Sequence, residues 1–427
     1  MSSMPFTRVV IIGGGFAGLN VAKKLKKVKA DIFLIDRKNH HLFQPLLYEV
    51  ASAALSPGEI GIPIREILRH YENTTVILGN VVNIDKEKRT ITLGNDDQIN
   101  YDYLVVATGA RHSYFGNDTW EEFAPGLKTL SDAIKIREKI LMSFEKAERS
   151  DSIAEATKYL NFAIVGGGPT GVEMAGAIAE IAHKTMFKNF RRIRPEKSKI
   201  YLIEAMPRIL PPYPEKLSER AKKDLEKMGV NVMVNTKVLK VTKEGVETDK
   251  GLVEAYNIIW AAGNQASPLL KTLNVPLDRQ GRVVVESDLT VPNHPEIFVI
   301  GDAACVIGKD GKPLPALAPV AIQEGKYVSW IIKKDLPKNL RPAFKYFDKG
   351  NLATIGKSKA VGFVGKFQFS GLFAWLGWCF VHIIYLIGFR NRLSVMLEWF
   401  FFYLTGQRGA RLIYETIDEK LSPQKPL

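Results

Sequence analysis

A glycine-rich turn that occurs twice is the feature that most constrains the fold of this chain. Residues 9–18 read VVIIGGGFAG and residues 162–171 read FAIVGGGPTG, so an apolar strand leads in each copy into glycines with GxGxxG spacing. The first glycine permits a tight turn, the second lets a pyrophosphate approach the backbone, and the third lets the following helix pack on the strand. The sequence therefore predicts an α/β fold with two Rossmann-like dinucleotide-binding units.

An acidic residue closes the next strand of each unit. DIFLID ends in Asp36, and the strand within KIYLIEA ends in Glu204. A carboxylate at this place accepts hydrogen bonds from ribose hydroxyls. Glu204 should also repel the 2′-phosphate of NADPH, which favours NADH, although the nearby Arg208 softens that preference. The alternative is a strand–turn–helix corner that binds no ligand.

Three later strands end in small residues. They are DYLVVATG at 102–109, NIIWAAG at 257–263 and IFVIGDAA at 297–304. Small residues at a strand end let the chain pass close to a bound cofactor. The carboxylate of Asp302 can in addition bond the ribityl hydroxyls of a flavin, although an ordinary strand end would read the same way.

Charge and cysteine content exclude several other classes of protein. The chain has a formal net charge of +14, which favours an anionic partner. The basic run KKLKKVK at 23–29 is expected on the solvent-exposed face of a helix, so no nucleic acid is expected as a partner. The basic insert at 184–199 is expected to be a surface helix and loop with no assigned function. The two cysteines, Cys305 and Cys379, form no CxxC pair, which excludes a dithiol relay, and no ligand cluster for a metal is present.

Together these motifs resemble the two-dinucleotide-binding-domain flavoproteins over residues 5–345. In that superfamily the first unit holds FAD and the second binds NAD(P)H. A later Gly-Asp pair, the GD element, completes the FAD site and corresponds here to Gly301 and Asp302. Four further stretches are similar to the type II NADH dehydrogenases, the single-subunit NADH:quinone oxidoreductases. They are HHLFQPLLYEVA at 40–51, LAPVAIQEG at 317–325, LATIGKSKAVGFVG at 352–365 and LIGFRNRL at 386–393.

This resemblance implies a domain layout and a set of site residues. FAD is expected on residues 1–118 and 290–350, NADH on 119–289, and a membrane-anchoring region at 351–427. The residues expected to contact FAD are Gly13, Gly15, Gly18, Asp36, Arg37, Gln44, Thr108, Gly109, Gly301 and Asp302. Those expected to contact NADH are Gly166, Gly168, Gly171, Glu204, Ala262 and Gly263.

The resemblance also implies that electrons pass from FAD to a membrane quinone without proton pumping. Gln323 is expected to contact the quinone, with a polar helix start packing under the flavin as the alternative. Glu173, in the opening turn of a helix, is expected to serve as a proton route, with a structural glutamate stabilised by the helix dipole as the alternative. The family motif AQxxxQ is altered here, because Pro319 follows Ala318, so this corner is expected to differ in shape. His382 and Tyr385 are weaker candidates for the quinone path.

The carboxyl end is expected to meet the bilayer surface. Residues 370–389 contain no Lys, Arg, Asp or Glu, so they either cross the membrane or lie in one leaflet. A following amphipathic helix has Leu393, Met396, Leu397, Phe400 and Leu404 on one side, and Arg390, Arg392, Arg408 and Arg411 flank it as candidates for anionic headgroups. A core helix pair or a dimer interface is the alternative.

The location and the competing function follow from the same features. The start MSSMPFTRVV lacks the pattern of a secretory signal, so a peripheral protein on the cytoplasmic face of the cell membrane is expected, with a homodimer as the default assembly and a frayed tail at SPQKPL. The competing interpretation is a soluble flavoprotein reductase serving a protein such as ferredoxin, or a redox-sensing protein of the apoptosis-inducing type. Neither needs the aromatic carboxyl end.

Overall fold

The computed structural model describes residues 7–414, which fall into two compact units. Unit 1 comprises Met1–Leu42, Gly61–Ser113 and Gly263–Lys349, and unit 2 comprises Phe43–Ile60, Tyr114–Ala262 and Gly350–Leu427. The first six residues and the SPQKPL tail lie outside the described residues. Each unit contains one of the two glycine-rich motifs, so the repeat in the sequence corresponds to two separately folded α/β cores.

Unit 1 is built on a six-stranded sheet in the order β20-β21-β9-β1-β2-β5. Every neighbouring pair is parallel except β20 and β21, and the order from β5 to β21 is that of a dinucleotide-binding fold. The strands are β1 (Thr7–Ile12), β2 (Ala30–Asp36), β5 (Thr74–Leu78), β9 (Tyr103–Val106), β20 (Thr290–Val291) and β21 (His294–Val299). Because parallel strands are buried on both faces, their runs of Val, Ile and Leu form the core of the unit.

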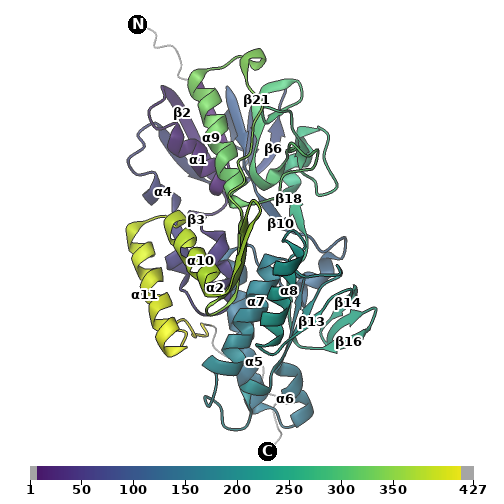
Figure 1. Ribbon diagram of the computed structural model, residues 1–427. Coiled ribbons are helices and arrows are strands. Elements are labelled where there is room, and N and C mark those ends of the chain that lie inside the picture. The colour runs from purple at the N-terminus through teal and green to yellow at the C-terminus, as the bar shows by residue number, and fades with distance from the viewer. Residues whose placement is uncertain (1–6, 415–427) are drawn as a thin grey trace, which may run out of the picture. The chain divides into compact units, whose positions relative to one another are not determined.

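Helices α1 (Phe16–Lys24) and α9 (Ala318–Lys334) lie side by side in unit 1 (Figure 1). A Cβ on Gly325 would lie 2.5 Å from the carbonyl oxygen of Ala17, so this glycine allows the close crossing. Since α1 ends at Lys24, the second half of the basic run at 23–29 lies beyond the helix, and the expectation of one continuous helical face is wrong there.

The rest of unit 1 consists of short elements that connect the strands of this sheet. They are β3 (His40–Leu42), β4 (Gly61–Pro63), α4 (Ile64–Ile67), β6 (Val81–Asp85), β7 (Thr90–Leu93), β8 (Gln98–Asn100), β10 (Ala110–His112), β18 (Asn264–Ala266), β19 (Val283–Val284) and β22 (Ala304–Cys305). Strands β6, β7 and β8 form a small antiparallel sheet, and β10 pairs with β18.

Unit 2 has a four-stranded parallel sheet in the order β13-β12-β11-β17. Its strands are β11 (Asn161–Val165), β12 (Lys199–Ile203), β13 (Val230–Met233) and β17 (Asn257–Trp260), with an antiparallel sheet of β14 (Val238–Thr242), β15 (Gly245–Thr248) and β16 (Gly251–Glu254). The helices of this part are α2 (Leu47–Ala51), α3 (Pro57–Ile60), α5 (Leu130–Arg149), α6 (Ile153–Tyr159), α7 (Pro169–Glu180) and α8 (Glu215–Glu226). Trp260, at the end of β17, is the largest fully buried side chain of this core.

The basic insert at 184–199 is mostly irregular rather than helical. A single π-helical turn covers Ile181–Thr185, and a short 3-10 turn covers Pro195–Lys197. The Glu148 carboxylate at the end of α5 accepts hydrogen bonds from the backbone N–H groups of Arg191, Arg192 and Ile193. These bonds hold the insert against α5 and give it a structural role.

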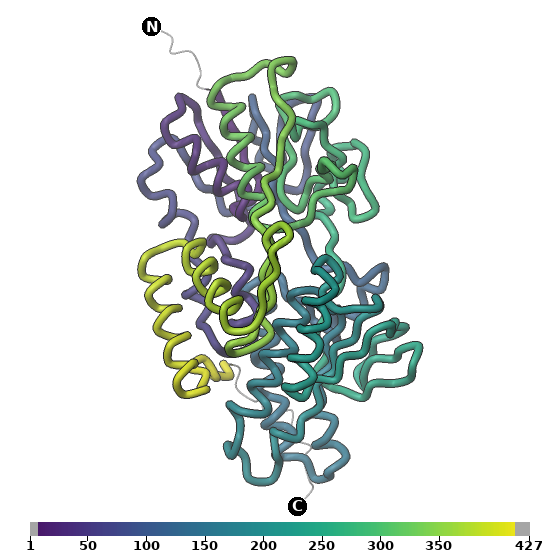
Figure 2. Tube along the Cα trace, in the orientation of Figure 1, coloured from purple at the N-terminus to yellow at the C-terminus, as the bar shows by residue number. Residues whose placement is uncertain are grey.

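The carboxyl-terminal segment of unit 2 forms an antiparallel sheet followed by two helices. They are β23 (Asn351–Gly356), β24 (Lys359–Val364), β25 (Phe367–Ser370), α10 (Leu372–Tyr385) and α11 (Phe389–Thr405). Figure 2 shows the β23–β24 hairpin beside the teal segment of α7 and α8, and a Cβ on Gly176 of α7 would lie 1.8 Å from the Ile355 carbonyl oxygen. The segment therefore packs closely on α7.

The uncharged run at 370–389 is not one helix. It begins in β25, turns at Gly371, forms the 14-residue helix α10 and ends where α11 starts. A 14-residue helix is about 21 Å long, which is short of the roughly 30 Å hydrocarbon core of a bilayer. Within residues 7–414, no helix has the length and apolar character needed to cross a membrane.

Candidate functional site

The first glycine-rich turn forms a cradle in unit 1. Gly13 has φ of +108°, and a Cβ on it would lie 2.3 Å from the Ala107 carbonyl oxygen. A Cβ on Gly18 would lie 1.9 Å from the Gly13 carbonyl oxygen, so only glycine lets α1 approach β1 this closely. A Cβ on Gly15, in contrast, meets no atom within 4 Å. The turn is therefore tightly packed on one side and open at the middle glycine, where a pyrophosphate can approach the N-terminus of α1.

The carboxylate of Asp36 closes this turn. Its Oδ2 accepts a hydrogen bond from the Gly14 N–H at 2.6 Å, and its Oδ1 accepts one from the Lys38 N–H at 2.7 Å. Arg37, expected beside it at the FAD site, is exposed. The Thr108 hydroxyl is buried and has no hydrogen-bond partner among residues 7–414. An open cradle, an acidic strand end and an unsatisfied buried hydroxyl are the features that fit FAD.

Sequence reasoning missed two residues, one that supports this turn and one that supports Gly301. His41 is buried, packs edge-on against Phe16 with 5.1 Å between ring centroids, and its Nδ1 lies 3.0 Å from the Gly14 carbonyl oxygen. Burial lowers the pKa of His41, so its ring is neutral and Nδ1–H is the donor. Glu324 is also buried, and its Oε2 accepts a hydrogen bond from the Gly301 N–H at 2.5 Å. Both residues lie within the stretches that resemble the type II enzymes, but no local sequence pattern predicts the hydrogen bond that either one forms.

The GD element lies in unit 1 with the first turn. Gly301 has φ of +68°, and Gly109 has φ of +67°, so both positions favour glycine. Burial raises the pKa of Glu324 to about 8, and the charge of Asp302 acts in the same direction. Glu324 is therefore largely protonated at neutral pH. Thr108, Gly109, Gly301 and Asp302 all belong to the unit that contains the first cradle.

The second cradle, in unit 2, repeats the geometry of the first. Gly166 has φ of +109°, and a Cβ on Gly171 would lie 1.8 Å from the Gly166 carbonyl oxygen, while one on Gly168 meets nothing within 4 Å. Glu204 occupies the place of Asp36, because its Oε2 accepts from the Gly167 N–H at 2.6 Å and its Oε1 from the Met206 N–H at 2.7 Å. This arrangement fits a second dinucleotide, in this case one with a free ribose hydroxyl.

Two residues expected to contact a cofactor lie in a different unit from the other residues assigned to that cofactor. Gln44, assigned to FAD, belongs to unit 2, where its side-chain amide donates to the Lys128 carbonyl oxygen at 3.2 Å. Gly263, assigned to NADH, begins the last segment of unit 1, directly after Ala262 of unit 2. Their roles stay predictions.

The altered quinone motif starts a regular helix. Ala318 is the first residue of α9 and Pro319 the second, where a missing N–H costs no hydrogen bond, so the proline leaves the start of the helix undistorted. The carboxamide of Gln323 donates to the Phe347 carbonyl oxygen at 2.9 Å and accepts from the Phe347 N–H at 3.0 Å. A quinone that contacts Gln323 must therefore compete with Phe347 for the polar atoms of this side chain.

Glu173 lies in the second turn of α7, not in its opening turn. The helix begins at Pro169 and has no acidic residue in its first turn, so stabilisation by the helix dipole does not explain this glutamate. Burial raises the pKa of Glu173 well above its usual range, and the charge of Glu49 adds to the shift, while a bond from the Thr354 backbone opposes it. The protonated form of Glu173 is therefore favoured.

Comparison with known proteins identifies the family. Residues 7–325 match the family model described as pyridine nucleotide-disulphide oxidoreductase, and residues 349–408 match the NDH2 C-terminal domain. The chain is 46% identical over 418 residues to the type II NADH:quinone oxidoreductase Ndh of Mycobacterium tuberculosis, covering 94% of this chain and 89% of the relative. It is 30% identical to the type II NADH:quinone oxidoreductase of Staphylococcus haemolyticus, with 84% and 89% covered. The chain belongs to the type II NADH:quinone oxidoreductases.

Solved structures agree on the fold. NDH2 from Plasmodium falciparum in complex with NADH superposes with a TM-score of 0.87 at 23% identity, covering 94% of this chain and 99% of that one. The sulfide:quinone oxidoreductase of Aquifex aeolicus gives a TM-score of 0.72 at 19% identity, covering 91% and 92%.

Family membership confirms the expected fold class, cofactors and reaction. The chain is an FAD-dependent enzyme of the class that carries electrons from NADH to a quinone without pumping protons. Its only two cysteines, Cys305 and Cys379, are both free thiols.

The carboxyl-terminal region of this type II enzyme corrects one set of expectations. Arg408 does not face outward, because it is 4% exposed and forms a 3.0 Å ion pair with Glu180. Arg392 donates to the Leu386 and Ile384 carbonyl oxygens at the end of α10. His382 stacks on Trp378 with 4.1 Å between centroids, and burial lowers its pKa to about 4, so it is neutral. Of the flanking arginines, Arg390 and Arg392 remain exposed.

Proposed function

We propose that unit 1 holds FAD, unit 2 holds NADH, and Gln323 and Glu173 serve the reduction of quinone. The observation that carries this proposal is the pair of cradles, each open at its middle glycine and closed by a carboxylate, Asp36 in one and Glu204 in the other. FAD, held in unit 1, would supply the acceptor for a hydride from NADH and the donor of two electrons to quinone. The protein binds and orients both nucleotides and supplies a proton.

The reaction consumes one proton from outside the reactants. NADH, one proton and quinone give NAD⁺ and quinol, so two electrons and one proton come from NADH and the second proton comes from water. A side chain that is protonated at neutral pH can hold this proton near the site. Burial raises the pKa of Glu173 and favours its protonated form, which makes it the candidate for this role.

Replacing Glu204 with glutamine should weaken the preference for NADH over NADPH. The carboxylate lies at the end of β12 and carries the charge that repels a 2′-phosphate, so we expect the ratio of kcat/KM for the two nucleotides to fall about tenfold. Steady-state kinetics with both nucleotides measures this ratio. Glu215→Gln, which neutralises an exposed glutamate of the same unit, is the matched control. An unchanged ratio in Glu204→Gln contradicts the assignment.

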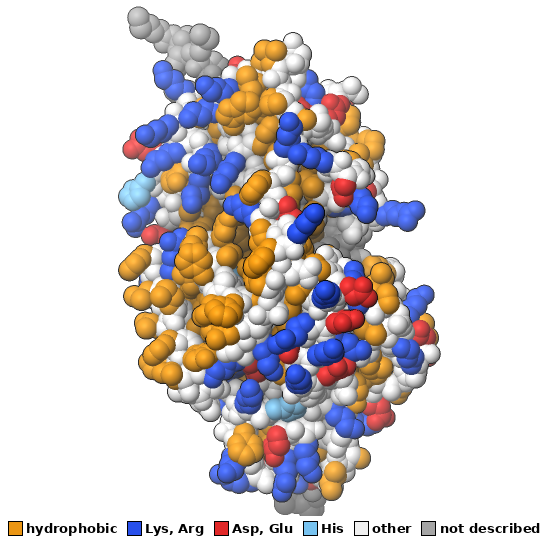
Figure 3. Space-filling model, in the orientation of Figure 1, with side chains coloured by type: hydrophobic (Ala, Val, Ile, Leu, Met, Phe, Trp, Pro, Cys, Tyr) orange, Lys and Arg blue, Asp and Glu red, His pale blue; other side chains and the backbone are white. Residues whose placement is uncertain are grey.

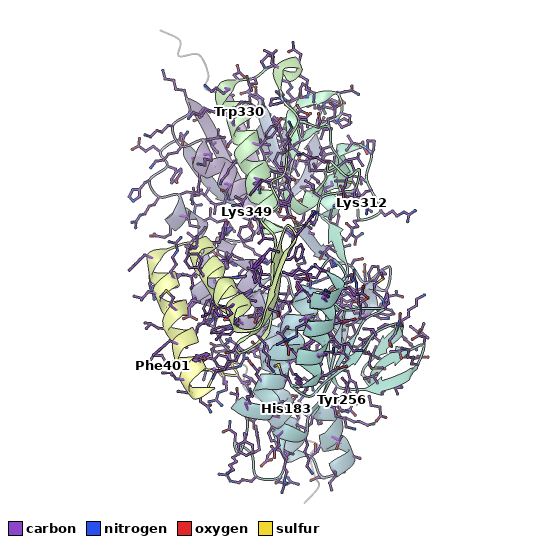
Figure 4. The ribbon with its side chains drawn as sticks, in the orientation of Figure 1. His183, Tyr256, Lys312, Trp330, Lys349 and Phe401 are labelled. Atoms are coloured by element: carbon purple, nitrogen blue, oxygen red, sulfur yellow. The ribbon has the colours of Figure 1, made fainter. Side chains whose placement is uncertain are left out.

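The outer surface of α10 and α11 supports attachment to a bilayer. On α11 the amphipathic pattern points outward, because Leu393, Met396, Leu397, Phe400 and Leu404 are 47–63% exposed. The polar side faces inward: Ser394 donates to Glu59, and Trp399 donates to Glu49. Figure 3 shows hydrophobic side chains gathered over both helices, and Figure 4 labels Phe401 on the outer side of α11. A face of this kind supports a monotopic membrane protein.

Phe400→Ser combined with Phe401→Ser should release the protein from membranes. Both rings are more than half exposed, and losing roughly 1 kcal/mol of burial for each should lower partitioning onto vesicles about thirtyfold. Co-sedimentation with vesicles containing anionic lipid measures the effect, while turnover of a water-soluble quinone should persist. Phe115→Ser, an equally exposed ring of another segment, is the control. Undiminished sedimentation of the double variant would favour a different role for this face, such as a dimer interface.

A soluble reductase of a protein acceptor leaves this exposed apolar face unexplained. Attachment to the cytoplasmic face and assembly as a homodimer belong to the same proposal, the second resting on the general prevalence of two-fold assemblies. Sedimentation of the purified enzyme in detergent tests the assembly directly.

A further inference from the structure

A cavity lies inside unit 2, among α2, α7, β23, α10 and α11. Its space open to the centre of a water molecule is about 50 Å³, and since about 10–15 Å³ of such space holds one water, there is room for a few. Four carboxyl groups line it, and two of them, Glu49 on α2 and Glu173 on α7, lie on different helices. Part-exposed Glu398 and Lys357 also line it, so the cavity extends toward the surface.

Glu49 is held so that it can exist in both protonation states. It is 7% exposed; its Oε1 lies 2.9 Å from the Tyr48 hydroxyl, and its Oε2 accepts from Trp399 Nε1 at 2.7 Å. The indole can only donate, but the tyrosine hydroxyl can donate or accept. A proton on Oε1 therefore reverses the bond to Tyr48, whose hydroxyl oxygen then accepts from the carboxylic acid.

We propose that Glu49 is a second proton-holding residue of this enzyme, which takes up the proton consumed in each turnover from the cavity and passes it on toward Glu173. The inference rests on the proton role proposed above for Glu173. In the step itself, the O–H bond of the Glu49 carboxylic acid breaks, an O–H bond forms on Glu173 after that residue has given its proton to the quinone, and water then reprotonates Glu49. No oxidant or reductant beyond NADH and quinone is needed.

Burial places the titration of Glu49 near neutrality. Burial is the largest influence and raises its pKa to about 7, against the bonds from Trp399 and Tyr48 and the charge of Arg408. The titratable and charged groups that line the same cavity are Tyr48, Glu173, Glu180, Lys357, Cys379, Glu398 and Arg408. Below about pH 7 Glu49 is neutral and can donate a proton, and above it the residue is charged and cannot.

Infrared spectroscopy of the full-length enzyme tests the titration without relying on activity. A pH-difference series should show a protonated-carboxyl C=O component that fades as the pH rises through about 7, and Glu49→Gln should remove this component and leave the one from Glu324, whose pKa is about 8. The glutamine keeps an acceptor for Trp399 and a donor for Tyr48, so the fold should be retained. Glu59→Gln is the matched control, because Glu59 also accepts a bond from α11, through Ser394, but does not line the cavity. A band unchanged in Glu49→Gln overturns the proposal.

Stopped-flow half-reactions test the role in turnover. Glu49→Gln should slow oxidation of the flavin by quinone on the order of tenfold to a hundredfold and leave its reduction by NADH within about twofold. In the unaltered enzyme the quinone step should slow as the pH rises through about 7, and this dependence should disappear in Glu49→Gln. Glu49→Asp, which keeps an ionisable carboxyl, should retain the pH dependence with a shifted midpoint.

The two proposals fail separately. If Glu173→Gln slows the quinone step but Glu49→Gln does not, the proton role of Glu173 stands and that of Glu49 is wrong. If Glu173→Gln leaves the quinone step unchanged, the role proposed for Glu173 is wrong, whereas the infrared band still decides whether Glu49 titrates. Equal slowing of both half-reactions by Glu49→Gln would indicate a merely structural residue and overturn this inference.

Discussion

Gly18→Ala should yield an enzyme that has lost its FAD. A Cβ there would lie 1.9 Å from the Gly13 carbonyl oxygen, so α1 or the turn must shift, and the shift displaces the backbone that receives the pyrophosphate. We expect FAD affinity to fall at least about 100-fold, which corresponds to about 2.7 kcal/mol. Flavin absorbance per protein after purification, followed by titration of the stripped protein with FAD, measures the loss.

Substitutions at two other glycines distinguish a loss of packing from a loss of contact with FAD. Gly15→Ala adds a methyl group into open space at a backbone φ of −70°, so the stripped protein should melt normally while FAD binding weakens. Gly58→Ala, also into open space but away from both cradles, should change neither property. In Gly18→Ala the stripped protein itself should melt at a lower temperature. Full flavin content in that variant would show that the turn tolerates a methyl group and that the packing argument is wrong.

Arg408→Ala should destabilise the protein by about 3–5 kcal/mol, the usual cost of leaving a buried charge without its partner. The Arg408 guanidinium donates to Glu180 Oε2 at 3.0 Å, and to the Ser52 carbonyl oxygen and hydroxyl at 2.9 and 2.7 Å. It thereby ties the segment after α11 to α2 and α7. A fall in melting temperature of roughly 5–10 °C is the expected readout.

The matching control removes both charges of that pair. Arg408→Met with Glu180→Gln leaves no uncompensated charge, so the double variant should recover more than half of the loss. Arg411→Ala, which removes one hydrogen bond to the Arg408 carbonyl oxygen, should cost less than about 1 kcal/mol. A double variant no more stable than Arg408→Ala would show that packing of the arginine side chain, and not its charge, holds this segment.

Much of the site was predictable because its signals are local in the chain. The glycines of each cradle, with Asp36 and Glu204 at the following strand ends, are set by the requirements of one strand–turn–helix unit, and the structure places them within hydrogen-bonding reach of each other. The same reasoning failed for Arg408, which was expected at the membrane surface. The position of a charge beside an apolar helix does not reveal that its partner is a buried carboxylate on another helix.

The repeated glycine motif, taken as sequence, determined that this chain forms two dinucleotide-binding cores, because backbone sterics and strand burial act over a few residues. Only the tertiary structure decided which face of α11 points outward, where Glu49 finds Trp399 across 350 positions of sequence, and which carboxyl groups share a cavity. Such contacts depend on desolvation and on partners from distant segments. No local pattern encodes them.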